Sequence, residues 1–218
     1  MTTDSLRQST LTYRKQISPD VYWIGYKRQD TFSPGQVVKL TLDKNIPPRI
    51  YSICSGRDES EIRILFNIKE SGLLTPKLAE LPIGSPLFVS APYGSFLDTS
   101  TASWWIATGT GIAPFYSMMR SGMHSHKTLL HGFRFRNQAY FETECLRALG
   151  ENYHRCCSAE TGKGIYSGRV TDFLKAQVAL PVDHRYYICG QASMAVEVRD
   201  ILIAKGIPFT NISTEIYF

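Results

Sequence analysis

The sequence lacks several features that would place it in a well-defined class. No apolar run approaches the roughly 18 residues that a membrane span requires, so we expect no membrane association. The polar stretch from Met1 to Tyr13 has neither an apolar core nor a small-residue cleavage site, and we expect no secretory signal there. Lys and Arg residues form no basic block and no stripe interleaved with aromatics, which argues against a nucleic-acid partner.

Cysteine is scarce and irregularly spaced. The five cysteines are Cys54, Cys145, Cys156, Cys157 and Cys189. Their number is odd, and their spacing matches neither a disulfide framework nor a zinc site nor an iron–sulfur cluster. We therefore expect a reduced, cytoplasmic protein without a metal centre of its own.

The bulk composition is that of an ordinary folded protein. With 218 residues and 43% hydrophobic content, the chain is long enough for one large domain or two small ones. Its formal charge is +5 and its pI is near 8.9. A mildly basic surface suits an acidic protein partner and phosphate-bearing cofactors equally well.

The first half of the chain predicts an antiparallel β structure. Short runs rich in β-branched and aromatic residues alternate with turn signals, at Leu11–Ile17, Val21–Tyr26, Gln36–Leu42, Arg49–Cys54, Glu61–Ile68 and Pro86–Ala91. Six such strands indicate a small barrel over residues 1–98. One helix is expected at Thr75–Leu81, with Thr75 as its N-cap and Pro76 as its first residue. The polar stretch Asp98–Ser103 is interpreted as a linker.

The second half, residues 99–218, alternates between strands and helices. We expect strands at Trp104–Ala107, Lys127–Phe133, Tyr153–Cys157 and Arg185–Cys189, helices at Phe115–Arg120, Gln138–Leu149, Val170–Ala176 and Ala192–Lys205, and a final extended run at Phe209–Phe218. This alternation predicts a parallel sheet with helices on both faces. Ligands bind such sheets at the carboxyl ends of the strands. Thr108–Pro114, His131–Arg134, Ser158 and Cys189 fall there.

Three short stretches carry candidate binding chemistry. On the strand at Arg49-Ile50-Tyr51-Ser52, a cation and an aromatic hydroxyl share one face, which suits a phosphate and a ring system, although an ordinary strand with an exposed Arg also fits. Gly72-Leu73-Leu74-Thr75 opens the expected helix, where free N–H groups attract phosphate, or it simply caps a surface helix. Gly109-Thr110-Gly111 follows an apolar strand and lets the backbone approach a dinucleotide; no P-loop Lys follows it.

Taken together and in chain order, these stretches resemble the ferredoxin–NADP reductase superfamily. The Arg-x-Tyr-Ser strand is similar to its flavin-binding signature, Gly72–Thr75 to its flavin-diphosphate loop, and Gly109–Pro114 to its nicotinamide-nucleotide loop. Cys189-Gly190 and the C-terminal Glu215-Ile216-Tyr217-Phe218 also match. The resemblance covers nearly the whole chain and implies an N-terminal antiparallel FAD-binding β-barrel followed by a C-terminal parallel-sheet domain that binds NADP.

The resemblance also assigns residues to each cofactor. The FAD residues that it implies are Arg49, Ile50, Tyr51, Ser52, Asn67, Ile68, Lys69, Gly72, Leu74, Thr75, Tyr217 and Phe218. The NADP residues that it implies are Thr108, Gly109, Thr110, Gly111, Arg134, Ser158, Lys163, Arg169, Cys189 and Gly190. Bacterial relatives usually read Ser-Arg-Glu where this chain has Ser158-Ala159-Glu160, so one cation for the 2′-phosphate is missing. We still expect NADPH to be preferred over NADH, because Arg134 and Arg169 remain and Lys163 can substitute.

Four residues are expected to take part in the chemistry. The family pattern places the Cys189 thiol beside the nicotinamide, the Ser52 hydroxyl at flavin N5, Glu215 in flavin protonation, and the Tyr217 ring against the isoalloxazine. Phe218 resembles an added C-terminal aromatic that covers the adenine of FAD in some bacterial members. A ring stacked in the nicotinamide's place must move before hydride transfer, so the tail would act as a gate.

The resemblance implies an enzyme that moves a hydride between NADP(H) and FAD, and single electrons between FAD and ferredoxin or flavodoxin. Such carriers are typically acidic, which suits the basic chain. We expect a monomer. The alternatives are a reductase component of an oxygenase, a reductase of free flavin or ferric chelates, and a flavin-binding electron-transfer subunit that does not turn over NADPH.

Overall fold

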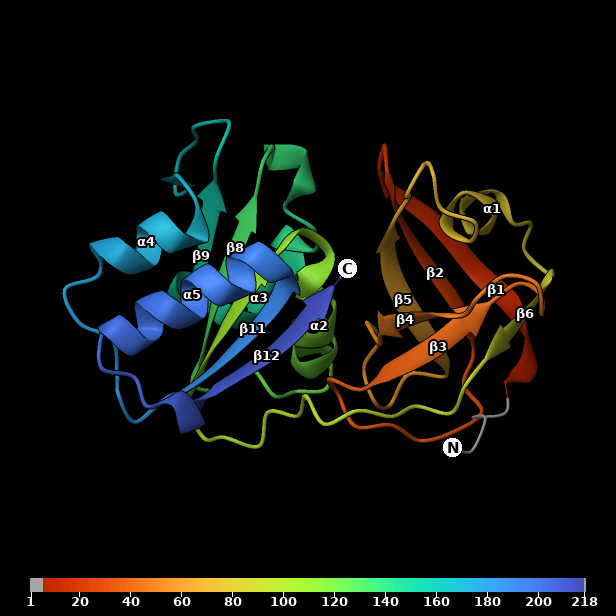
Figure 1. Ribbon diagram of the computed structural model, residues 1–218, viewed down its shortest axis with the longest axis horizontal. Coiled ribbons are helices and arrows are strands. Elements are labelled where there is room, and N and C mark those ends of the chain that lie inside the picture. Colours follow the sequence, from red (N-terminus) through yellow and green to blue (C-terminus); the bar gives the residue numbers. More distant parts are fainter. Residues whose placement is uncertain (1–5, 218) are drawn as a thin grey trace. The chain divides into compact units, whose positions relative to one another are not determined.

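The computed structural model describes residues 6–217 (Figure 1). The chain divides into two compact units. The first unit contains the described residues up to Leu97 together with Ala113–Ser121, and the second unit contains Asp98–Ile112 and Gly122 onward. Among the described residues, no helix has the length and apolar character that crossing a membrane requires.

The first unit is built on one antiparallel six-stranded sheet, as the sequence predicts. Its strands are β1 (Arg7–Ser18), β2 (Val21–Lys27), β3 (Val37–Thr41), β4 (Arg49–Ser52), β5 (Glu61–Asn67) and β6 (Pro86–Val89), in the spatial order β4-β3-β6-β1-β2-β5. The two edges meet just after β4, where Ile53 bridges Ile64 and the Cys54 N–H donates to the Arg63 carbonyl at 2.7 Å. The sheet therefore curls back on itself, and its edges are joined over this one short stretch.

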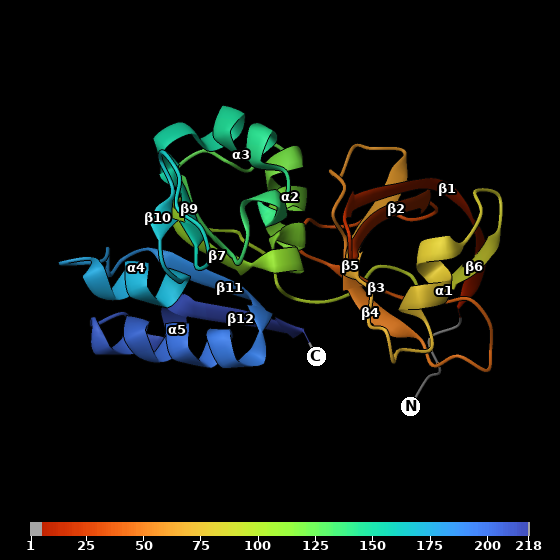
Figure 2. The same cartoon turned by 90° about the horizontal axis from the view of Figure 1, so that it is seen from above.

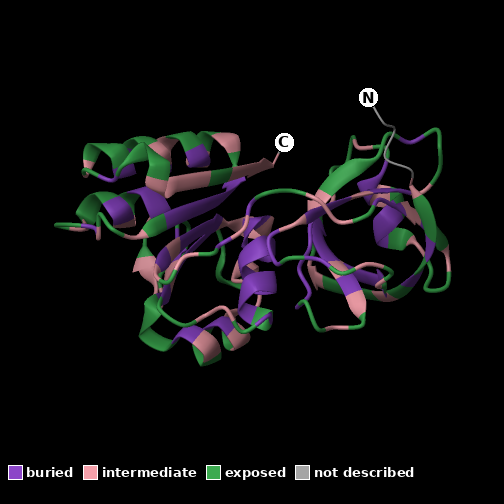
Figure 3. Cartoon of the chain, turned by 90° about the horizontal axis from the view of Figure 1, so that it is seen from below, coloured by how far each residue is buried: buried purple, intermediate pink, exposed green. Residues whose placement is uncertain are grey.

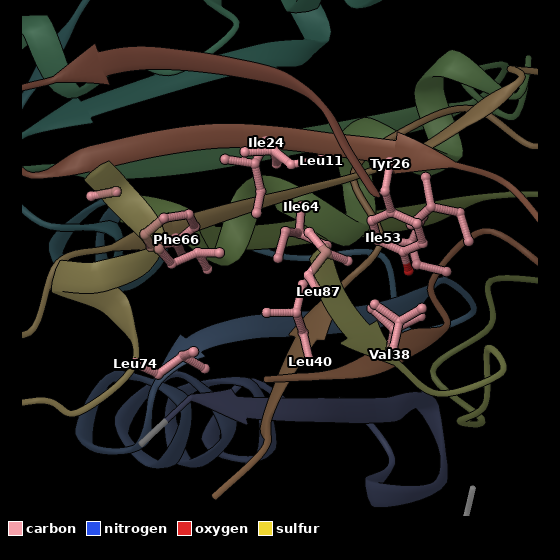
Figure 4. Packing of buried hydrophobic residues seen from close by; sticks show 14 of the residues in the cluster. Leu11, Ile24, Tyr26, Val38, Leu40, Ile53, Ile64, Phe66, Leu74 and Leu87 are labelled. Carbon is pink, nitrogen blue, oxygen red and sulfur yellow. The ribbon is translucent and has the colours of Figure 1, made fainter. Parts of the chain in front are cut away.

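The concave face of this sheet is filled mainly with aliphatic side chains, together with the aromatic Tyr26 and Phe66 (Figure 4). Leu11, Ile24, Leu40, Ile64 and Leu87 come from five different strands, and each is 0% exposed. Full burial of one such side chain contributes about 1.5–3 kcal/mol to folding. Helix α1 (Thr75–Glu80) adds its apolar side to the same core. This packing fixes the strands whose outer ends carry the candidate site.

Helix α2 (Ala113–Arg120) packs on the first unit although the Gly-rich loop directly before it belongs to the second. Its Phe115 ring lies edge-on to Phe96, with the ring centroids 5.8 Å apart. At its C-terminal end, the Arg57 Nη2 donates to the Ser121 carbonyl at 2.9 Å. A cation at this end of a helix satisfies a free carbonyl and complements the helix dipole.

The second unit contains a parallel six-stranded sheet, again as predicted. Its strands are β7 (Ser103–Thr108), β8 (Lys127–Phe133), β9 (Tyr153–Cys157), β10 (Tyr166–Ser167), β11 (Arg185–Gln191) and β12 (Ile212–Tyr217), in the order β10-β9-β8-β7-β11-β12. The two-residue strand β10 is not evident in the sequence. The central strands β7, β8 and β11 are almost wholly buried (Figure 3), as near-continuous apolar runs predict.

Helices cover both faces of this sheet. Figure 2 shows α4 (Val170–Ala176) and α5 (Ala192–Ala204) on one face and α3 (Glu142–Leu149) on the other. The helix expected from Gln138 begins only at Glu142. The chain first forms the 3₁₀ turn η2 (Arg136–Gln138), and Phe141 then takes a left-handed conformation with φ of 60°. The remaining 3₁₀ turns are η1 (Gly109–Ile112), η3 (Gly150–Asn152) and η4 (Phe209–Asn211), of which η4 precedes β12.

The segment interpreted as a linker begins with a buried charge. Asp98 is 2% exposed. Its Oδ2 accepts hydrogen bonds from Ser103 Oγ at 2.5 Å and Trp105 Nε1 at 2.7 Å, and it lies 3.0 Å from Lys127 Nζ. Ser103 and Lys127 are the first residues of β7 and β8. The carboxylate therefore joins the amino ends of the two strands whose carboxyl ends face the candidate nucleotide site.

The order of the strands places that site. In the second unit, β7 is the first strand along the chain, and β8, β9 and β10 follow on one side of it. The chain then returns to the other side of β7 with β11 and β12. The point where the order reverses lies between β7 and β11. Open α/β sheets bind their ligands in the crevice at the carboxyl ends of the strands on either side of such a point.

Candidate functional site

In the first unit, strand β4 presents the predicted Arg-x-Tyr-Ser residues at an edge of the sheet. Arg49 is exposed, as is Ile50, whose exposed fraction is 57%. Ser52 is buried. Tyr51 is half-buried and lies edge-on to Phe66, with the ring centroids 6.1 Å apart. Its buried Oη has no hydrogen-bond partner among the described residues, and burial raises the pKa of this phenol. An unsatisfied hydroxyl beside an exposed guanidinium fits a ligand with a polar ring and a phosphate.

The loop from Asn67 to Thr75 is held by its own hydrogen bonds. The Lys69 N–H donates to Thr75 Oγ1 at 2.8 Å, and the Gly72 N–H donates to the Lys69 carbonyl at 2.7 Å. A Cβ at Gly72 would lie 2.9 Å from that carbonyl oxygen, so the turn requires glycine.

The expected N-cap role of Thr75 is wrong. Thr75 is the first residue of α1, and Leu74 occupies the cap position without a side-chain hydrogen bond. The Thr75 hydroxyl instead accepts from the Lys69 N–H. Because α1 begins at Thr75, Pro76 is its second residue and not its first. Its internal hydrogen bonds hold the loop in one conformation, in which Asn67 and Lys69 are exposed.

In the second unit, two glycines shape the loop after β7 for different reasons. Gly109 has a φ of 53°, in the left-handed region that favours glycine, and a Cβ there would meet open space. Gly111 has no such backbone requirement. A Cβ on Gly111 would lie 2.3 Å from the carbonyl oxygen of Cys189, so only glycine lets the loop pack against the end of β11. Thr108 and Thr110, the other predicted residues of this loop, are half-buried.

The hydroxyl of Thr108 is a polar group at this point that suits a ligand. Thr108 Oγ1 is buried and has no hydrogen-bond partner among the described residues. A Cβ on Gly190 would lie 2.3 Å from this oxygen. Gly190 thus allows the end of β11 to approach the end of β7 closely. A buried hydroxyl without a partner, between two glycine-lined strand ends, fits a dinucleotide with polar atoms to bond.

The C-terminal strand brings the predicted chemical residues together. The parallel register pairs Cys189 with Glu215 and Gln191 with Tyr217. Cys189 Sγ lies 4.0 Å from Glu215 Oε2, and Cys189 is fully buried. Burial, and then the Glu215 carboxylate, raise the pKa of the Cys189 thiol well above its ordinary value. The sulfur is therefore a neutral thiol that donates toward Glu215, and it is not a nucleophilic thiolate. Phe218 lies outside the described residues.

The predicted cations for a 2′-phosphate lie at the carboxyl ends of β8 and β9 and in the connections that follow. Arg134, Lys163 and Arg169 are all exposed. A polar hollow of about 540 Å³ opens beside Ser158. The residues lining it are Arg136, Ser158, Ala159, Glu160, Thr161 and Ser167.

Arg136 lines this hollow, and sequence reasoning did not single it out. It lies two positions beyond Arg134 and has the sequence surroundings of an ordinary solvated cation. Its backbone N–H donates to Glu160 Oε2 at 2.6 Å, which ties the two sides of the hollow together. The Arg134 carbonyl accepts from the Ala159 N–H at 3.0 Å, so the segments after β8 and β9 are joined a second time.

Among the described residues, no group of three His, Cys, Asp or Glu side chains is arranged to hold a metal ion. All five cysteines are buried free thiols. The donors assembled at both sites are hydroxyls, guanidinium groups and backbone N–H groups, which bind phosphates and polar rings.

Comparisons with known proteins agree with this geometry. Residues 105–200 match the family described as the oxidoreductase NAD-binding domain. The chain is 31% identical over 209 residues to the ferredoxin–NADP reductase of Azotobacter vinelandii, covering 81% of this chain and 80% of that protein. It is 23% identical over 219 residues to the electron transfer component of toluate 1,2-dioxygenase from Pseudomonas putida. That match covers 94% of this chain, which spans only 65% of the relative.

Among solved structures, a ferredoxin NADP⁺ reductase from Neisseria gonorrhoeae with bound FAD and NADP superposes with a TM-score of 0.88. It is 21% identical, and the superposition covers 98% of this chain and 99% of that one. This likeness shows the fold. Together with the match to the Azotobacter protein, it establishes that the chain belongs to the ferredoxin–NADP reductase superfamily of oxidoreductases.

Proposed function

We propose that this protein is an FAD-dependent reductase that exchanges a hydride between NADP(H) and FAD and single electrons between FAD and a separate protein carrier, ferredoxin or flavodoxin. The observation that carries the proposal is the group of residues at the strand-order reversal. There, the unsatisfied Thr108 hydroxyl, the close approach of Gly111 and the Cys189–Glu215 pair lie at the ends of adjacent strands. Bound FAD supplies the two-electron and one-electron chemistry, and the protein supplies position and electrostatics.

In the first unit, each proposed FAD residue has a role that its chemistry allows. Arg49 would bind the diphosphate through charge-assisted hydrogen bonds, and the loop ending at Thr75 would contribute to holding the same group. The Tyr51 hydroxyl, which has no hydrogen-bond partner within residues 6–217, would find one in the ligand. Ser52 is buried beside it and is proposed to hold the flavin ring edge where the hydride arrives.

In the second unit, the roles follow from burial and charge. Cys189, as a neutral thiol, positions the nicotinamide without attacking it. Glu215 lies beside it and is proposed to hold a proton. The Tyr217 ring is proposed to cover the flavin and to move aside for the nicotinamide. Arg136 and Arg134 are proposed to bind the 2′-phosphate in the hollow beside Ser158, which favours NADPH.

A second candidate is a reductase component of an oxygenase, and the similarity to the toluate dioxygenase component favours it. Both candidates share hydride transfer and differ in the electron acceptor. The formal charge of +5 suits an acidic carrier. The rate at which such a carrier is reduced should fall as ionic strength rises, because salt screens the attraction between the two proteins. Comparing ferredoxin, flavodoxin and an oxygenase as acceptors, each at low and high salt, separates the two candidates.

The direct test is the visible spectrum of the purified protein before and after anaerobic addition of NADPH or, in a parallel cuvette, NADH. A flavin spectrum bleached much faster by NADPH supports the proposal. A flavin that neither nucleotide bleaches contradicts hydride transfer and points to a non-catalytic flavin-binding subunit. A protein without flavin that takes up none on incubation with FAD contradicts the whole assignment.

The FAD site is tested by Arg49→Ala, with Lys15→Ala as the matched control. Both changes remove one exposed cation from the first unit, but Lys15 lies on β1, which does not adjoin β4 in the sheet. Arg49→Ala should lower FAD affinity by about tenfold or more, because a charge-assisted hydrogen bond contributes about 1.5–3 kcal/mol. Equal FAD retention by the two variants would refute the role of Arg49.

A further inference from the structure

A fully buried histidine lies directly beneath the nucleotide loop. His131 is on β8 and is 0% exposed. Its Nε2 lies 3.3 Å from the carbonyl oxygen of Gly109, and its Nδ1 lies 3.2 Å from the hydroxyl of Tyr153. The ring thus connects the first glycine of the loop after β7 to the first residue of β9. The roles proposed above for other residues make no use of it.

The chemistry of the neighbours fixes where the proton lies. Burial lowers the pKa of His131 to about 4, so the ring is neutral at physiological pH and has one N–H and one lone pair. A carbonyl oxygen only accepts, and therefore Nε2 carries the hydrogen and donates to Gly109. Burial also raises the pKa of Tyr153, which keeps its phenol protonated. That phenol donates to Nδ1.

Two aromatic rings hold the imidazole in this orientation. Tyr153 stacks on it with an interplanar angle of 24° and a centroid distance of 6.4 Å. Phe133 contacts it edge-on, with the centroids 5.4 Å apart. A 180° flip of the ring would exchange Nε2 with Cε1 and Nδ1 with Cδ2, so carbon atoms would face the Gly109 carbonyl and the Tyr153 hydroxyl and both hydrogen bonds would be lost. The packing and the hydrogen bonds therefore specify the same single arrangement.

The held residue is the one whose backbone conformation shapes the loop. Gly109 has a φ of 53°, and a Cβ built on it would meet no atom within 4 Å, so no neighbouring group fills the space on that side of the turn. The packing of Gly111 on β11 holds the far side of the loop, and the hydrogen bond from His131 to the Gly109 carbonyl restrains its first residue. Loops that bind phosphates gain affinity when their N–H groups are oriented before the ligand arrives.

We propose that His131, oriented by Tyr153, is a positioning residue that holds the Gly109–Ile112 loop in its nucleotide-binding conformation. The inference rests on the proposed function in one respect, namely that this loop binds NADP(H). In this proposal, His131 touches neither nucleotide nor flavin. It acts by keeping the Gly109–Ile112 loop in one conformation.

The test compares His131→Met with His131→Gln. The two replacements have similar length and shape, but only Gln can donate to the Gly109 carbonyl. The FAD-loaded proteins are titrated with NADP⁺, and binding is followed by calorimetry and by the flavin difference spectrum. We expect His131→Met to raise the Kd about tenfold and His131→Gln to stay within about threefold of wild type. Their melting temperatures should fall by similar amounts. Equal Kd values for the two variants would overturn the inference.

Two further measurements do not depend on these variants folding. In a ¹⁵N spectrum of histidine-labelled wild-type protein, His131 should show the Nε2–H tautomer, and an Nδ1–H tautomer would overturn the inference. Tyr153→Phe removes the donor to Nδ1 and should raise the Kd for NADP⁺ about threefold; an unchanged Kd would remove Tyr153 from the proposal. A wild-type protein that binds no NADP⁺ would refute the proposed function itself, and this inference with it.

Discussion

Replacing Asp98 with asparagine should destabilise the second unit strongly. The carboxylate is 2% exposed and accepts from Ser103, Trp105 and Lys127, whose ammonium group is itself buried. Removing one partner of a buried pair leaves the other charge uncompensated, which costs about 3–5 kcal/mol. In a chain of this length, each kcal/mol lowers the melting temperature by about 2–4 °C, so we expect a fall of about 6–20 °C.

The assay is thermal and urea unfolding followed by circular dichroism, with Asp183→Asn as the control. Asp183 is an exposed carboxylate of the same unit, and its replacement should change stability by less than about 0.5 kcal/mol. Adding Lys127→Met to Asp98→Asn should recover part of the loss, because no buried charge then remains. A single-variant loss below about 1 kcal/mol would refute the view that this pair joins the strand ends.

The same carboxylate predicts a dependence on pH. Burial raises the pKa of Asp98, but the hydrogen bonds from Ser103, Trp105, the Ser100 N–H and Lys127 outweigh it, so the pKa lies below its ordinary value. The stabilisation is therefore fully present above the unfolded-state pKa of about 3.9 and is lost as the pH falls through the folded-state pKa. Wild type should lose this contribution below about pH 4, whereas Asp98→Asn should lack it at every pH.

Three further changes test the nucleotide site. Gly111→Ala should cost about 1–3 kcal/mol of stability and weaken NADP⁺ binding, because the new Cβ would lie 2.3 Å from a backbone oxygen. In Gly109→Ala the new Cβ would meet open space, so the left-handed backbone conformation alone should cost about 1–2 kcal/mol. Ala159→Arg should raise the ratio of kcat/KM for NADPH over NADH about tenfold through a charge-assisted bond, and an unchanged ratio would mean that this position faces away from the 2′-phosphate. Tyr217→Ser should shift the flavin absorbance and tighten NADP⁺ binding about threefold to tenfold, because a stacked ring no longer has to be displaced; an unaltered spectrum and Kd would refute the gate.

Much of the fold could be predicted because its determinants are local. Alternating apolar residues between turn signals identify the six antiparallel strands, and the alternation of apolar runs with helical segments identifies most of the parallel ones. Elements that depend on single backbone angles could not be predicted in this way. The left-handed conformation of Phe141 shortens α3, and the pairing of Tyr166 and Ser167 beside β9 creates β10. Neither has a propensity signal in the sequence.

The candidate site likewise contains some residues that the sequence identifies and others that depend on packing between distant segments. The loop glycines, Cys189 and Glu215 could each be named from the family resemblance, whereas the pairing of Cys189 with Glu215 depends on the register of β11 and β12 and is not predicted. Arg136 could not be predicted, and His131 is named only as part of the strand-end segment His131–Arg134, without its burial against the Gly109 carbonyl. Their importance arises from packing between segments far apart in the chain, which turns one ordinary surface cation into a lining residue and one strand histidine into a buried support.

The packing of α2 on the first unit has a practical consequence for dissecting this protein. The chain leaves the first unit at Leu97, returns for Ala113–Ser121 and leaves again. If the chain were cut at residue 98, the C-terminal fragment would carry α2, whose Phe115, Tyr116 and Met118 are buried in the whole protein and would then face water. This fragment should aggregate. The N-terminal fragment should lack the helix that covers part of the antiparallel sheet. A separable nucleotide-binding fragment over residues 99–218 would need Ala113–Ser121 replaced by a short polar connection. The folding of that redesigned fragment would test the expected domain boundary at residue 98.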